Sequence, residues 1–116
     1  ILEALSQKYP LVLVSNFYGN IESVLKDFHL DTYFKSIVES AVVGIRKPDP
    51  AIFGLGVKEL SLPAETIVVI GDSHDKDIIP ATSIGCKSIG WSDYRGDESA
   101  DLVITDFTEL EQAFSL

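Results

Sequence analysis

The sequence predicts an α/β fold built on a parallel sheet and no membrane-spanning helix, and one observation supports each prediction. Short runs rich in Val, Ile and Leu alternate with longer amphipathic stretches, which is the pattern of parallel strands joined by crossover helices. The longest apolar runs, such as 11–14 and 67–70, fall far short of the roughly 20 residues that a membrane-spanning helix needs. A chain of 116 residues has room for one domain, which we place over 1–116.

The first half of the chain contains two predicted strands and two predicted helices. Residues 11–14 are uniformly apolar, as expected of a strand buried on both faces, and a weaker strand follows at 36–39. Between them, apolar residues at helical spacing predict a helix over 20–28, with Asn20 as its N-cap. A second helix is predicted over 51–60, because Asp49 suits the N-cap and Pro50 suits the first helical position.

The second half continues the alternation of strands and helices. Residues 66–70 form the clearest predicted strand. A helix then starts between Ser73 and Asp77 and ends near Gly85, with Pro80 expected to shorten or kink its first turns. Two short strands are predicted at 87–90 and 102–105. Asp106, with Glu109 three residues later, is expected to cap a final helix that runs to about Phe114.

Composition and charge exclude several classes of partner. Hydrophobic residues make up 46% of the chain and charged residues 23%, which fits a globular domain with a buried core. Acidic residues outnumber basic ones by 18 to 9 and give a net charge of −9. This balance argues against nucleic acid and anionic membranes as partners, since both bind through basic residues. The single cysteine, Cys86, cannot form an internal disulfide, and we expect a cytoplasmic protein.

Polar residues that follow the predicted strands are the candidate site residues. In open parallel sheets, ligands bind beyond the carboxyl ends of the strands. Ser15 and Asn16 end the first strand, Asp72 follows the third, and Lys47 lies just before a helix N-terminus. Together they offer a hydroxyl, an amide, a carboxylate and an ammonium group, which are suited to hold a phosphoryl group beside a divalent cation.

Three segments in this order resemble the motifs of the haloacid dehalogenase-like hydrolase superfamily. Leu13-Val14-Ser15-Asn16 is similar to the family's second motif, and Gly44-Ile45-Arg46-Lys47-Pro48-Asp49-Pro50 to its third. Ile70-Gly71-Asp72-Ser73, followed by Asp77, is similar to the fourth. The resemblance extends from about residue 11 to 105, and the three motifs together are far more specific than any one of them.

The resemblance implies a Rossmann-like three-layer core and a role for each matched residue. Ser15 and Asn16 would bind the transferring phosphoryl group, Lys47 would offset its charge, and Asp72 and Asp77 would serve Mg²⁺. Lys47 and Asp72 are the catalytic candidates. The implied reaction is Mg²⁺-dependent hydrolysis of a small phosphorylated metabolite through an aspartyl-phosphate, although relatives with these motifs also perform dehalogenation or phosphomutase chemistry.

One part of the family pattern has no counterpart in this sequence. The family's nucleophile lies in an Asp-x-Asp motif at the end of an N-terminal central strand, and a helical cap follows it. The chain starts at Ile1, contains no Met, and has only 14 residues before Ser15. We therefore expect the C-terminal portion of the core, inactive alone and weak in Mg²⁺ affinity. Strands 11–14 and 66–70 should flank a gap that an N-terminal segment or a second copy fills.

Two other classes of function fit parts of the sequence. One is a non-catalytic α/β module that associates through its incomplete sheet, which the oligomeric state would distinguish. The other is a phosphoacceptor receiver domain, which has a similar length and uses aspartate, a hydroxyl residue and lysine in that order. The order here is Ser15, Lys47, Asp72, which argues against a receiver domain.

Overall fold

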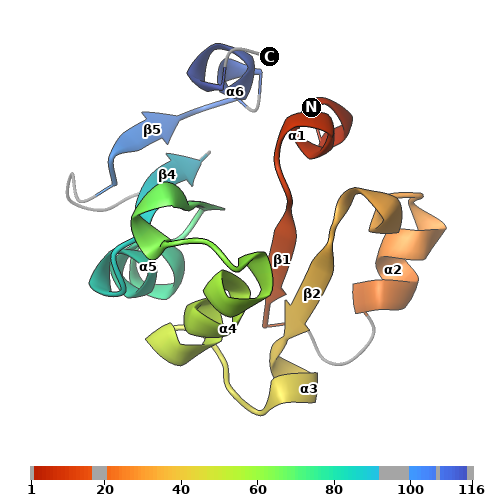
Figure 1. Ribbon diagram of the computed structural model, residues 1–116, viewed down its shortest axis with the longest axis horizontal. Helices are drawn as coiled ribbons and strands as arrows, with labels where there is room; N and C mark the ends of the chain where they lie inside the picture. Colours follow the sequence, from red (N-terminus) through yellow and green to blue (C-terminus); the bar gives the residue numbers. More distant parts are fainter. Residues whose placement is uncertain (1, 17–20, 92–99, 107, 115–116) are drawn as a thin grey trace.

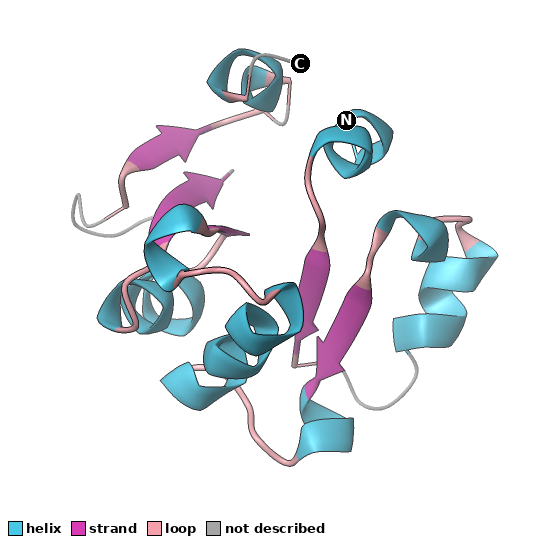
Figure 2. Ribbon diagram, viewed as in Figure 1, coloured by secondary structure: helices cyan, strands magenta, loops and turns pink. Residues whose placement is uncertain are grey.

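The described strands of the protein form two separate parallel sheets. The structure, a computed structural model, describes residues 2–16, 21–91, 100–106 and 108–114. Figure 2 shows the strands in two groups, and Figure 1 shows β1 beside β2 and β4 beside β5. The α/β class with parallel strands is therefore confirmed. One sheet pairs β1 (Val12–Ser15) with β2 (Ser36–Glu39), and the other has the order β3 (Val68–Gly71), β4 (Lys87–Trp91), β5 (Leu102–Ile104).

Helices connect the strands largely where the sequence predicts them. Asp49 is the N-cap of the longest described helix, and its side chain accepts a hydrogen bond from the Ala51 backbone N–H at 3.0 Å. A left-handed residue, Gly85 with φ 95°, follows the helical segment after β3, as expected for a C-terminal glycine. The described α-helices are α1 (Leu2–Lys8), α2 (Ile21–Asp27), α3 (Ser40–Val43), α4 (Pro50–Leu60), α5 (Ile79–Ser83) and α6 (Glu109–Ala113).

One predicted boundary differs from the structure, one is confirmed with a different kind of turn, and one lies outside the described residues. The strand predicted from Thr66 starts at Val68, because Ala64–Thr66 forms a 3₁₀ turn and the Thr66 hydroxyl donates to the Pro63 carbonyl. The helix predicted to begin between Ser73 and Asp77 starts with a π turn, His74–Ile78, before α5. The N-cap predicted at Asn20 lies outside the described residues.

The predicted gap between β1 and β3 is confirmed. These two strands belong to different sheets, and no described strand pairs with both. Val68 and Ile70 of β3 are 38% and 37% exposed. An unpaired edge therefore borders the gap on each side.

Helix α4 joins the two halves of the molecule across the gap. Ile52 and Phe53 of α4 are buried and pack against Val12 and Val14 of β1 as well as Val69 of β3. A second core cluster brings Leu5 of α1 to β4, β5 and α6 through Ile89, Ile104 and Leu110. The two sheets are thus held in place by helices rather than by a shared ladder.

Candidate functional site

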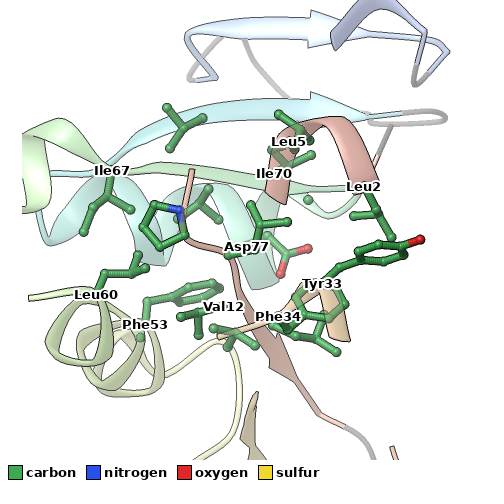
Figure 3. Close-up of a pocket in the computed structure, with 18 of the residues that line it drawn as sticks. Leu2, Leu5, Val12, Tyr33, Phe34, Phe53, Leu60, Ile67, Ile70 and Asp77 are labelled. Carbon is green, nitrogen blue, oxygen red and sulfur yellow. The ribbon is translucent and has the colours of Figure 1, made fainter. Parts of the chain in front are cut away.

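The gap between the sheets opens into a cavity of about 880 Å³. Its walls are mainly apolar, and Figure 3 shows Ile67 and Ile70 on the opposite side from Phe53 and Leu60. Lys47, Asp72 and Asp77 also line this cavity. Three of the predicted site residues, which come from two separate loops, therefore share one cavity.

Lys47 and Asp77 form an ion pair across the gap. The Lys47 Nζ donates to Asp77 Oδ1 at 2.7 Å, and the two side chains are only 17% and 7% exposed. The other carboxylate oxygen, Oδ2, accepts a hydrogen bond from the Ser73 backbone N–H at 3.3 Å. Both oxygens of Asp77 are therefore engaged, one with the lysine and one with the loop after β3.

The π turn after β3 places Asp77 in this position. The backbone N–H groups of Asp77 and Ile78 both donate to the Ser73 carbonyl, at 3.0 and 3.2 Å, which widens the turn. The Asp77 side chain then lies directly against Gly71, where an added Cβ would come within 2.5 Å of the Asp77 Cβ. The absence of a side chain at Gly71 thus leaves room for the Asp77 side chain at the end of β3.

The side-chain amide of Asn16 forms hydrogen bonds with both backbone groups of Lys47. The Lys47 N–H donates to Asn16 Oδ1 at 2.7 Å, and Asn16 Nδ2 donates to the Lys47 carbonyl at 3.1 Å. The amide orientation follows from its partners, because an N–H requires the oxygen and a carbonyl requires the NH₂ group. Asn16, Lys47, Asp77 and Ser73 thus form one hydrogen-bonded chain from the end of β1 to the end of β3.

Asp72 and Ser15 are the remaining predicted site residues. Asp72 is exposed, follows the last residue of β3 and lines the cavity. Ser15 ends β1 in register with Glu39 of β2 and is not among the described residues that line the cavity. The structure thus joins Asn16, Lys47 and Asp77 by hydrogen bonds and places Asp72 beside them, with Ser15 next to Asn16 in the chain.

Sequence reasoning missed one buried carboxylate near the site, that of Glu39. It ends β2, is only 6% exposed, and accepts a hydrogen bond from the Ile21 N–H at 3.4 Å through Oε1. Its carboxylate therefore holds the start of α2, the helix that follows Asn16 in the chain. The signal for it was its place at the carboxyl end of an apolar strand, the same criterion that selected Ser15.

The chain belongs to the haloacid dehalogenase-like hydrolase family, which it matches over residues 1–91. It is 37% identical over 75 residues to haloacid dehalogenase-like hydrolase domain-containing protein 3 of Danio rerio, covering 65% of this chain and 31% of that protein. It is 34% identical over 83 residues to the glyceraldehyde 3-phosphate phosphatase of Methanocaldococcus jannaschii, covering 67% and 36%.

A solved structure extends this likeness to the whole described fold. The crystal structure of a HAD phosphatase from Thermococcus onnurineus matches 97% of this chain with a TM-score of 0.91 and 28% sequence identity. That match covers 54% of the solved chain, and the curated relatives are spanned over about a third of their length (31% and 36%). The family membership decides against the receiver-domain alternative. No described helix has the length and apolar character needed to cross a membrane.

Proposed function

We propose that this chain forms part of the core of a Mg²⁺-dependent phosphatase that acts on a small phosphate ester. The observation that carries the proposal is the meeting of Lys47, Asp72 and Asp77 at one cavity, with Asn16 bound to the Lys47 backbone. A cation, carboxylates and an amide at the carboxyl ends of parallel strands can bind a phosphoryl group and a hard metal ion. The phosphatase relative from Methanocaldococcus supports the same reaction class.

Each residue has one role in the proposed reaction. The nucleophile is the aspartate of the family's Asp-x-Asp motif, which has no counterpart in this sequence. Its carboxylate oxygen attacks phosphorus, the ester P–O bond breaks, and the alcohol leaves. Water then cleaves the aspartyl-phosphate to release orthophosphate. The Ser15 hydroxyl and Asn16 would bind the phosphoryl oxygens. Lys47, held by Asp77, would offset the negative charge on the phosphoryl group.

Asp72 is the residue best placed to hold Mg²⁺. Its carboxylate is exposed at the cavity, and Mg²⁺ takes one or two carboxylates together with waters and phosphate oxygens. Asp77 would support the metal from behind Asp72, since both of its oxygens already contact Lys47 and Ser73. Within the described residues no group of three or more His, Cys, Asp or Glu is placed to hold a metal, so we expect the metal to bind weakly to this chain. When bound, Mg²⁺ would stabilise charge on the phosphoryl oxygens.

The cavity also supports a second proposal, in which an extended segment fills the gap. β1 and β3 both run parallel to their sheet neighbours, and each has an unpaired edge facing the cavity. A parallel strand with apolar side chains would pair with both edges and join the two sheets into one. Because the similar solved chain is about twice as long, we propose that the occupant is a segment of the parent protein carrying the Asp-x-Asp nucleophile.

The test is a phosphate-ester assay with and without this strand. The purified chain is weighed under denaturing and native conditions and assayed with a phosphate-ester panel in Mg²⁺. We expect no turnover from the chain alone, and turnover when a peptide containing the Asp-x-Asp strand is added. Asp72→Asn and Lys47→Met should each abolish the restored activity, because they remove the metal ligand and the cation.

Three results would count against these proposals. Strong Mg²⁺-dependent turnover by the chain alone would show that the nucleophile is already present. Binding of the peptide without any turnover would favour the non-catalytic module, in which the gap serves only for association. A native mass of twice the chain's mass, with no peptide binding, would assign the gap to a second copy.

A further inference from the structure

Asn16 has a second role that the motif resemblance does not contain. We propose that Asn16 is a positioning residue that sets the backbone of Lys47 and thereby directs the Lys47 ammonium to the site. The role of that ammonium rests on the proposed function, whereas the backbone contact stands on geometry alone. The argument depends on the two hydrogen bonds between one side-chain amide and one backbone residue.

The two hydrogen bonds define the conformation of Lys47. Because one planar amide meets both its N–H and its carbonyl, these two groups must point to the same side, as they do in an extended residue. The next residue, Pro48, also favours an extended conformation for the residue before it. The Asn16 amide therefore pairs with Lys47 as a neighbouring strand would.

The fixed backbone determines where the Lys47 side chain goes. It crosses from the loop before α4 to the π turn after β3 and ends on Asp77 Oδ1 at 2.7 Å. Asn16 follows β1 directly, so its hydrogen bonds connect Lys47 to the β1–β2 sheet. The ion pair with Asp77 connects Lys47 to the sheet that contains β3. Lys47 therefore bridges the two sheets at this end of the cavity.

Asparagine fits this position better than the residues closest to it in chemistry. Aspartate has the same shape but no N–H, so it would face the Lys47 carbonyl with an oxygen. Alanine removes both hydrogen bonds. Asn16→Asp and Asn16→Ala therefore test the donor alone and the whole contact, respectively.

The chain offers a matched control in a second side-chain-to-backbone contact. The Ser88 N–H donates to Asp101 Oδ2 at 2.9 Å, and the Asp101 N–H donates to Ser88 Oγ at 3.3 Å. This contact joins β4 to the start of β5, far from Lys47 in the topology. Asp101→Ala removes a hydrogen bond of the same kind without touching the proposed site.

The experiment measures amide hydrogen exchange and lysine NMR signals in the isotope-labelled 116-residue chain. We expect Asn16→Ala to lower the protection of the Lys47 amide at least tenfold, after correction with the core amide of Ile89, because it removes the acceptor of the Lys47 N–H. Asn16→Asp keeps that acceptor and loses the donor to the Lys47 carbonyl, so we expect both variants to shift the Lys47 Cε signal. Asp101→Ala should lower protection at Ser88 and leave Lys47 within twofold of the wild type. Unchanged Lys47 protection in Asn16→Ala would overturn the proposal.

Two further measurements keep the outcome decisive. If the Asn16 variants do not fold, the Asn16 Nδ2 protons are measured in the wild type, and exchange as fast as that of an exposed amide overturns the proposal. Orthophosphate titration separates the two roles: weaker phosphate binding with unchanged Lys47 signals would mean that Asn16 only binds the phosphoryl group, again overturning it. Altered Lys47 signals in a chain whose peptide complex has no phosphatase activity would leave the positioning role standing and remove the proposed function.

Discussion

Gly71 is the residue at which space limits the site most sharply. An added Cβ would lie 2.5 Å from the Asp77 Cβ, closer than such atoms approach, so either the π turn or β3 must shift. We expect Gly71→Ala to destabilise the chain by about 1–3 kcal/mol, the usual cost of overpacking. It should also weaken the Lys47–Asp77 ion pair, because Asp77 is the side chain displaced.

Gly54→Ala is the matched control for Gly71→Ala. An added Cβ at Gly54 meets nothing within 4 Å, and the residue lies inside α4. Alanine there should stabilise the chain by about 0.5–1 kcal/mol, because glycine is a poor helix former. Urea unfolding of both variants checks the pair, and equal stability of the two would show that Asp77 does not pack on Gly71 as described.

At the residue scale, the sequence predicted which side chains meet but not how they meet. Lys47 and Asp72 could be placed together because strand ends converge at one edge of a parallel sheet, and the family resemblance added Asp77. The contact of Asn16 with the Lys47 backbone could not, since it depends on the path of a loop 31 residues further along the chain. Residue identity gives the chemistry of an amide but not the partner that tertiary packing presents to it.

At the element scale, the sequence predicted the capping hydrogen bonds before α6, although the helix itself starts at Glu109 with Thr108 as its N-cap. Glu109 Oε2 accepts hydrogen bonds from the backbone N–H groups of Thr105 and Asp106, at 2.7 and 2.9 Å. Asp106 Oδ1 accepts from the Thr108 N–H at 2.9 Å. Local residues alone determine this capping arrangement, which explains why a three-residue spacing sufficed to predict it.

These hydrogen bonds give α6 a pH dependence. The backbone N–H groups of Asp106 and Thr105 lower the pKa of Glu109, and the backbone N–H and side-chain hydroxyl of Thr108 lower the pKa of Asp106. A carboxyl pKa that is depressed in the folded state adds stability above its ordinary pKa, and this stability is lost as pH falls through the depressed value. We therefore expect the protection of the Thr105, Asp106 and Thr108 amides to fall on acidification through this range.

Glu109→Gln is the control for the pH dependence of α6. Glutamine keeps the side-chain oxygen but does not titrate, so the Thr105 and Asp106 amides should lose most of their pH dependence. Amide exchange measured from neutral to acid pH checks this outcome. The interpretation fails if the variant and the wild type lose protection at the same pH.

The π turn after β3 marks the limit of prediction at this scale. The sequence indicated a helix start between Ser73 and Asp77, but hydrogen-bond spacing within a turn depends on what its side chains reach. Here Asp77 contacts Lys47, Gly71 and Ser73 at once, and the wider turn accommodates all three. Periodicity describes which face of a helix is apolar, so it gives no information on such a polar, site-directed turn.

On the scale of the whole molecule, the gap between β1 and β3 could be predicted from the family resemblance. The resemblance implies a central strand that has no counterpart in this sequence. The strand at 66–70 was predicted to border this gap, and Val68 and Ile70 are more than a third exposed (38% and 37%). Apolar composition alone could not distinguish a covered strand from one awaiting a partner. A central strand of the kind we propose for the gap would cover both exposed side chains.

Two isoleucines on the strands that flank β4 test whether the β3 surface is part of a closed core or of an open groove. Ile104 of β5 is 2% exposed, whereas Ile70 of β3 is 37% exposed and lines the cavity. Ile104→Ala should cost about 2–5 kcal/mol, as usual for a buried site, and Ile70→Ala less than about half as much, because part of its surface already contacts water. Binding of the Asp-x-Asp strand would bury Ile70 and raise the cost of Ile70→Ala toward that of Ile104→Ala. Urea unfolding with and without the peptide measures both differences, and equal costs in the chain alone would mean that the face of β3 is already closed.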